Sequence, residues 1–85
     1  MDDVTEGILF KMFPNPASAA VTVALPVGVQ MLEVLDVTGK LVHLLPLTGQ
    51  PETIVLNTAN YTQGLYFVRV SHKQGAAVQK LQIVH

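Results

Sequence analysis

The stretch that decides the fold is VLDVTGKLV, which runs from Val34 to Val42. Apolar runs flank the loop residues 37–39, and a three-residue hairpin loop needs a residue with positive φ after its type I turn. Gly39 stands at that position, where a side chain would be strained. We therefore predict a β-hairpin in which Asp36 and Lys40 face each other across the turn as an exposed pair that helps to fix the register.

Length and composition limit the chain to one small domain. Its 85 residues are too few for two cores without disulfides or metals, and the chain has no cysteine. Hydrophobic residues make up 49% of the sequence and charged residues 13%, so some apolar side chains must stay exposed, which indicates a partner surface. The net charge of −1, with five basic residues, argues against nucleic acid as that partner.

The start of the chain has the composition of a linker. Residues 1–7 carry three of the six acidic residues and end in Gly7, so we assign them to a linker and residues 8–85 to the domain. This start lacks the basic and apolar regions of a signal peptide, and no stretch approaches the ~20 apolar residues of a membrane-spanning helix. If the domain acts outside the cytoplasm, we expect a segment upstream to carry it there.

Seven segments have the composition or the two-residue alternation of β-strands, and none has a helical period longer than one turn. Two stacked sheets would let each strand bury one face. We therefore predict an all-β fold, an immunoglobulin-like antiparallel β-sandwich of about seven strands. The predicted strands are residues 8–13, 18–25, 30–36, 40–45, 53–56, 64–71 and 77–84.

The alternation also predicts which side chains face the core. In the hairpin arms these are Leu32, Val34, Val42 and Leu44. The alternation also places Val21, Val23 and Leu25 on one face of the strand at 18–25, and Leu81 and Ile83 on one face of the last strand. In the strand that starts at Gly64, we expect Leu65 and Phe67 to cover an outer face. Tyr66 is either a plain core aromatic or a tyrosine corner, whose hydroxyl returns to the backbone of the preceding loop.

No group of residues has the pattern of a catalytic or metal site. The three histidines lack ligand spacing on a common strand face, no two carboxylates are placed for acid–base chemistry, and neither serine lies in a nucleophile elbow. Residues 60–62 match the N-glycosylation pattern, which is short enough to arise by chance, and we interpret them as loop. We expect no enzyme activity, no metal and no cofactor.

Four blocks, in order along the chain, resemble the C-terminal sorting domain of the type IX secretion system. They are FPNPA at 13–17, VLDVTGKLV at 34–42, GLYFVRV at 64–70 and KLQIV at 80–84. The resemblance covers residues 8–85. Three residues depart from the family pattern: Phe13 replaces a frequent Tyr, Tyr61 stands where Leu is expected, and His85 follows the usual apolar ending.

The resemblance implies an immunoglobulin-like sandwich at the end of a secreted cargo protein of a Gram-negative bacterium. Such cargo crosses the inner membrane on an N-terminal signal peptide and moves from the periplasm to the outer membrane, the cell surface or the extracellular space. Its partners are the outer-membrane translocon, a shuttle protein, and a cysteine-protease sortase that usually removes the domain and joins the cargo to surface lipopolysaccharide. Residues 1–7 would then be the end of the linker to the cargo.

A folded sorting signal must be read at its surface, and we expect the translocon to contact the last strand and the hairpin turn. The candidate recognition residues are Lys80, Leu81, Gln82, Ile83, Val84, Thr38, Gly39 and Lys40. Lys80 is the strongest of them, because that strand is otherwise short of charge. Other residues of the family motif are interpreted as structural, namely Phe13, Pro14, Asn15, Pro16, Asp36, Gly64 and Tyr66.

An immunoglobulin-like accessory or adhesion module that binds carbohydrate or protein is the alternative function. It predicts exposed aromatic side chains grouped on one face, and Tyr61 and Phe67 are the main residues available for that. Exposed strand edges and the surplus of apolar side chains also predict a possible homodimer of the isolated domain.

Overall fold

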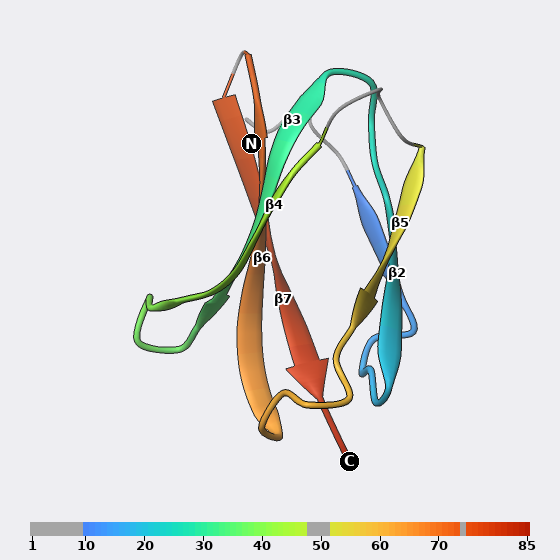
Figure 1. The fold of residues 1–85 in the computed structure, drawn as a ribbon, viewed down its shortest axis with the longest axis vertical. Coiled ribbons are helices and arrows are strands. Elements are labelled where there is room, and N and C mark those ends of the chain that lie inside the picture. Colours follow the sequence, from blue (N-terminus) through green and yellow to red (C-terminus); the bar gives the residue numbers. More distant parts are fainter. Residues whose placement is uncertain (1–9, 48–51, 74) are drawn as a thin grey trace, which may run out of the picture.

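The computed structural model describes residues 10–47, 52–73 and 75–85, and within them the chain forms seven β-strands and no helix (Figure 1). The predicted hairpin turn, residues 37–40, projects at the lower left of Figure 1. No helix long and apolar enough to cross a membrane is found among these residues. The strands are β1 (Lys11–Phe13), β2 (Ala20–Ala24), β3 (Val29–Asp36), β4 (Leu41–Pro46), β5 (Thr53–Asn57), β6 (Gly64–His72) and β7 (Gly75–Ile83).

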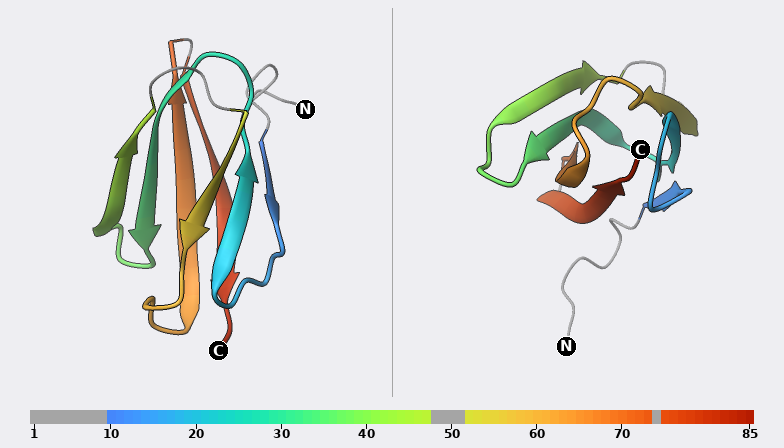
Figure 2. Two further views of the ribbon diagram at one scale, coloured as in Figure 1. Left: turned by 45° about the vertical axis from the view of Figure 1, so that its right-hand side comes forward. Right: turned by 90° about the horizontal axis from the view of Figure 1, so that it is seen from below.

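The strands form two sheets that pack face to face (Figure 2). One sheet has three strands in the order β1-β2-β5, and the other has four in the order β4-β3-β6-β7. Every pair of neighbouring strands is antiparallel. The predicted all-β antiparallel sandwich of seven strands is therefore confirmed, and its strand order is compatible with an immunoglobulin-like arrangement.

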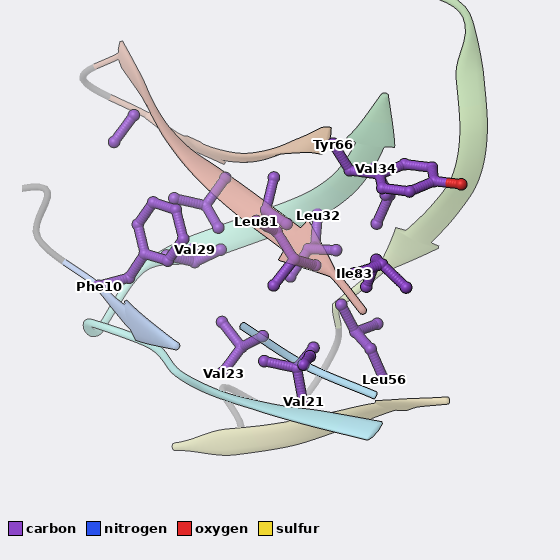
Figure 3. Packing of buried hydrophobic residues seen from close by; sticks show 14 residues of the cluster. Phe10, Val21, Val23, Val29, Leu32, Val34, Leu56, Tyr66, Leu81 and Ile83 are labelled. Carbon is purple, nitrogen blue, oxygen red and sulfur yellow. The ribbon is translucent and has the colours of Figure 1, made fainter. Parts of the chain in front are cut away.

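The core fills the space between the two sheets (Figure 3). Val21 and Val23 of β2 face Leu32 of β3 and Leu81 of β7 from the opposite side, as the alternation predicts, and all four are at most 1% exposed. Burying one such side chain stabilises the fold by roughly 1.5–3 kcal/mol, so these strands are held mainly by their inward faces. The cluster consists of Phe10, Ala17, Val21, Val23, Val29, Leu32, Val34, Leu56, Tyr66, Val68, Val70, Ala77, Leu81 and Ile83.

The predicted inward faces are correct for β3 and wrong for β4. Leu32 and Val34 are fully buried, whereas Val42 and Leu44 are 40% and 44% exposed. The cause is a β-bulge, because Val34 pairs with His43 and Leu35 with Leu41, which leaves Val42 as an extra residue. The bulge reverses the alternation, so that Leu45 contacts the core in place of Leu44.

Several strand boundaries differ by a few residues from those predicted. The strand expected at 18–25 is shortened to Ala20–Ala24, because the backbone of residues 17–19 bonds to the end of β7 and to the residue after β5. The strand expected from Ala77 already begins at Gly75. The predicted linker, residues 1–7, lies outside the described residues.

Candidate recognition surface

The turn between β3 and β4 has the predicted hairpin geometry. The N–H of Gly39 donates to the carbonyl of Asp36 at 3.0 Å, and the N–H of Asp36 donates to the carbonyl of Lys40 at 2.9 Å. Gly39 has a φ of 86°, in the left-handed region that disfavours any side chain. Thr38, Gly39 and Lys40 are all exposed, so this turn is accessible to a partner.

Asp36 does not form the predicted ion pair with the Lys40 side chain. Its Oδ1 accepts hydrogen bonds from the hydroxyl and the N–H of Thr38, at 2.6 and 2.9 Å, and from the N–H of Lys40 at 3.0 Å. The short aspartate side chain therefore closes its own turn, as such residues commonly do. The Thr38 hydroxyl, followed by the Lys40 N–H, holds the pKa of the Asp36 carboxyl below its usual value.

Strand β7 lies at an edge of the four-stranded sheet and divides the predicted recognition residues between two faces. Leu81 and Ile83 are fully buried, so their side chains are inaccessible to a partner while the domain is folded. Lys80 and Gln82 are exposed on the other face, and Val84 is exposed just beyond the strand. Within this strand, the accessible recognition candidates are thus the alternate residues.

Asn15 and Ala17 close part of the free edge of β7. The Asn15 Nδ2 donates to the carbonyl of Lys80 at 3.0 Å, and its Oδ1 accepts from the N–H of Gln82 at 3.1 Å. The N–H of Ala17 donates to the Gln82 carbonyl, and the Ala17 carbonyl accepts from the N–H of Val84, both at 2.8 Å. These four hydrogen bonds satisfy backbone groups that an edge strand would otherwise offer to another chain.

From the sequence, only a local feature of the Pro-Asn-Pro segment pointed to this closure of the β7 edge. Pro14 and Pro16 have no N–H, so Asn15 is the one residue of this Pro-Asn-Pro segment that can donate hydrogen bonds. Its partners on β7, however, lie 65 and 67 residues away. The sequence indicates a special role for Asn15, and the fold determines which strand it contacts.

Tyr66 is a tyrosine corner. Its hydroxyl donates to the carbonyl of Thr62, four residues upstream, at 2.7 Å, and its ring packs against Tyr61 with centroids 5.3 Å apart. His85 fastens the end of the chain to the same loop, because its Nε2 lies 2.7 Å from the carbonyl of Tyr61 and its N–H donates to Gln63 Oε1 at 3.1 Å. The loop before β6 is thereby fixed from two sides.

Two neighbouring rows of outward side chains on the four-stranded sheet make up the surface that we call the outer face. The first row is Leu41, Leu35, Phe67 and Lys80, and the second is Leu44, Glu33, Arg69 and Val78. As predicted, Phe67 lies on this face, half-buried. The first row starts next to the hairpin turn and ends at Lys80, a span of three interstrand spacings or roughly 14 Å. The outer face therefore connects the two parts of the predicted recognition surface.

The described part of the chain has no constellation typical of a metal or catalytic site. No three His, Asp or Glu side chains come together there as metal ligands would, and no pocket opens in its surface. The aromatic side chains needed by an adhesion module are not grouped either, since Tyr61 packs on Tyr66 while Phe67 lies on the outer face. The exposed features are strand faces and turns, which suit contact with a protein.

Comparison with known proteins agrees with this description. The family model "Secretion system C-terminal sorting domain" matches residues 11–84. Among solved structures, the chain is similar to PorZ, an essential bacterial surface component of the type IX secretion system of Porphyromonas gingivalis. The TM-score is 0.72 at 20% identity, over 94% of this chain and 12% of the PorZ chain.

The other comparisons add little to the family match. The chain has a TM-score of 0.45 to CopC from Methylosinus trichosporium OB3b, with 23% identity over 82% of this chain and 78% of CopC. No curated protein matches the sequence. At 20% identity the likeness to PorZ shows the fold alone, and the present chain matches only 12% of the PorZ chain.

Proposed function

We propose that this chain, which belongs to the family of secretion system C-terminal sorting domains, directs the protein that carries it through the outer membrane of a bacterium with a type IX secretion system. Domains of this family are the C-terminal sorting signals of that system, and a sorting signal is not an enzyme. Type IX cargo is exported to the outer membrane and to the cell surface or the extracellular space. The observation that carries the proposal is the family match over residues 11–84, which includes all seven strands.

We further propose that the outer-membrane translocon and its shuttle protein read the folded domain at the hairpin turn and at β7. The support is exposure, since Thr38, Gly39 and Lys40 project on a turn, and Lys80 and Gln82 point outward on an edge strand. Leu81 and Ile83 would contribute indirectly, by holding β7 in the core. Strand addition along residues 80–84 would require the partner to displace Asn15 and Ala17.

A sortase would then remove the domain and anchor the cargo at the cell surface. Removal of the whole domain would require a cut in the chain before β1, because every strand from β1 to β7 belongs to the sandwich. Residues 1–7 are the predicted linker to the cargo. Mass spectrometry of the exported cargo would identify the cleaved bond.

The test of the sorting function is an export experiment. Residues 1–85 are fused to the C-terminus of a reporter that carries a signal peptide, and the fusion is expressed in a type IX host and in the same host without a working translocon. We expect the reporter at the surface or in the medium of the first strain and in the periplasm of the second. Equal export from both strains, or retention in the periplasm of both, would refute the proposed function.

The recognition residues are tested in the same assay by Lys80→Ala combined with Gln82→Ala, and separately by Lys40→Ala. These side chains are exposed, so the substitutions should leave the fold intact, as circular dichroism of the purified domain would show. Reduced export of a folded variant supports the proposed contact. Unchanged export of both variants means that the translocon reads another surface.

A further inference from the structure

We propose that the outer face of the four-stranded sheet docks a protein partner whose surface is apolar and carries a carboxylate opposite Lys80. The inference rests on the proposed function, because the partner would be a component of the export machinery that reads the sorting signal. It extends that function by adding a broad sheet face to the turn and edge strand already considered. Two properties of the face support the proposal: its exposed apolar side chains and the charge of Lys80.

The first property is a surplus of large apolar side chains on this face. Leu41 and Leu44 on β4 and Val78 on β7 are 45%, 44% and 53% exposed, and Leu35 and Phe67 between them are only half-buried. The cross-strand pairs Leu41–Leu35 and Leu35–Phe67 make three of them direct neighbours in the first row, and Leu44 and Val78 lie at the two ends of the second row. A row of apolar side chains on a sheet that already packs its other face on the core indicates a docking surface.

The second property is the positive charge that remains on this face once its internal ion pair is taken into account. Arg69 Nη1 lies 3.4 Å from Glu33 Oε1, so these two charges in the second row compensate each other. Lys80, at the end of the first row, has no ion pair among the residues that the structure describes. If a partner covered the two rows, the edge of its contact surface would lie over Lys80. A carboxylate of the partner at that edge would form an ion pair with the lysine.

A second copy of the chain fits this face less well. If two outer faces met, each Lys80 would need a carboxylate from the other copy, and the carboxylate on the face, Glu33, is already bonded to Arg69. The bulge and Pro46 on β4 also interrupt regular edge-to-edge pairing of two such strands. The face is therefore better suited to a partner with a different, more acidic surface.

The test compares matched substitutions on the two outer surfaces of the sandwich. Leu44→Glu places a carboxylate at an apolar position of the second row, and Lys80→Glu reverses the charge at the end of the first row. The controls are Val55→Glu and Lys11→Glu, because both residues are exposed on edge strands of the three-stranded sheet, where Val55 is 67% exposed. All four variants are made in the reporter fusion, and their thermal unfolding is measured on the purified domain.

We expect Leu44→Glu and Lys80→Glu to lower the exported fraction by about tenfold or more, because like charges and an unpaired carboxylate at an interface are costly. The two control variants should export within about twofold of the unmodified fusion, as surface substitutions away from an interface usually do. If Leu44→Glu unfolds the domain, Lys80→Glu and its control Lys11→Glu decide the result.

Three outcomes would overturn the inference. Export of folded Leu44→Glu and Lys80→Glu at the level of the controls would show that this face is not read, while the sorting function itself stands. Failure of the unmodified fusion to be exported would remove the proposed function and the inference together. Sedimentation that shows a dimer of the isolated domain, dissociated by Leu44→Glu and not by Val55→Glu, would assign the face to a second copy.

Discussion

Replacing Asn15 by Ala should destabilise the domain through the edge of β7, although Asn15 is an exposed residue in a loop. The substitution removes the bond to the carbonyl of Lys80 at 3.0 Å and the bond from the N–H of Gln82 at 3.1 Å. A hydrogen bond of this type contributes about 0.5–1.5 kcal/mol net to stability. Because water can reach the groups left behind, we expect a total loss of about 1–2 kcal/mol in the free energy of unfolding.

The loss is large enough to measure in a domain of this size. In a domain of 60–100 residues, 1 kcal/mol shifts the melting temperature by about 4–8 °C, so Asn15→Ala should melt about 4–16 °C lower. With a urea dependence of about 1 kcal/mol per M for a small protein, the urea midpoint should fall by about 1–2 M. Calorimetry and urea titration followed by circular dichroism measure the two quantities independently.

Asn60→Ala is the matched control, because Asn60 is also an exposed asparagine in a loop and makes no side-chain hydrogen bond within the described part of the chain. We expect it to change stability by less than about 0.5 kcal/mol. A third variant, Asn15→Asp, keeps the acceptor for Gln82 but replaces the donor to Lys80 with a carboxylate oxygen. If Asn15→Ala is as stable as Asn60→Ala, the hydrogen bonds of Asn15 do not stabilise the edge.

The remaining predictions concern the core, the tyrosine corner and the hairpin turn. Leu81→Ala should cost about 2–5 kcal/mol in urea unfolding, because the side chain is fully buried, whereas Val78→Ala on the exposed side of the same strand should cost less than about 0.5 kcal/mol. Tyr66→Phe should lose about 1–2 kcal/mol by the same measurement, since the partly buried carbonyl in the preceding loop loses its hydroxyl donor; an unchanged midpoint would contradict that role. The lowered pKa of Asp36 stabilises the fold above the pKa of the unfolded chain, so this contribution should fade as the pH drops below about 4. Asp36→Asn should lack this contribution at every pH. In melting curves recorded from pH 6 to pH 2.5, the difference in melting temperature between Asp36→Asn and the unmodified domain should therefore be smaller at pH 2.5 than at pH 6.

The features that sequence reasoning predicted correctly depend on neighbours close in the chain. Gly39 specified the hairpin because the turn needs a positive φ three residues after Asp36, and the alternation in β2 and β7 followed from side chains two residues apart. The tyrosine corner could be offered as one of two alternatives for Tyr66 for the same reason, because its partner Thr62 is only four residues upstream. Such local geometry is contained in the sequence itself.

The features that sequence reasoning missed depend on long-range placement. The bulge at Val42 reverses the faces of β4, and in LVHLL, where apolar residues occupy both faces, nothing shows where an extra residue will be inserted. The contact of Asn15 with β7 spans 65 residues. For the recognition surface, the sequence indicated Lys80 and the turn, but the outer face that joins them emerges only once the register of four strands is known.

The position of β7 also makes the order of folding depend on the order of synthesis. Val21 and Val23, in the first third of the chain, pack against a layer that includes Leu81 and Ile83, and Ala17 pairs with the backbone of residues 82–84 at the end of β7. A product that stopped before residue 75 would leave one side of its interior open to water and would lack the strand that Asn15 secures. Because β7 is the last of the seven strands to be synthesised, the sandwich can close only after residues 75–83 have been translated.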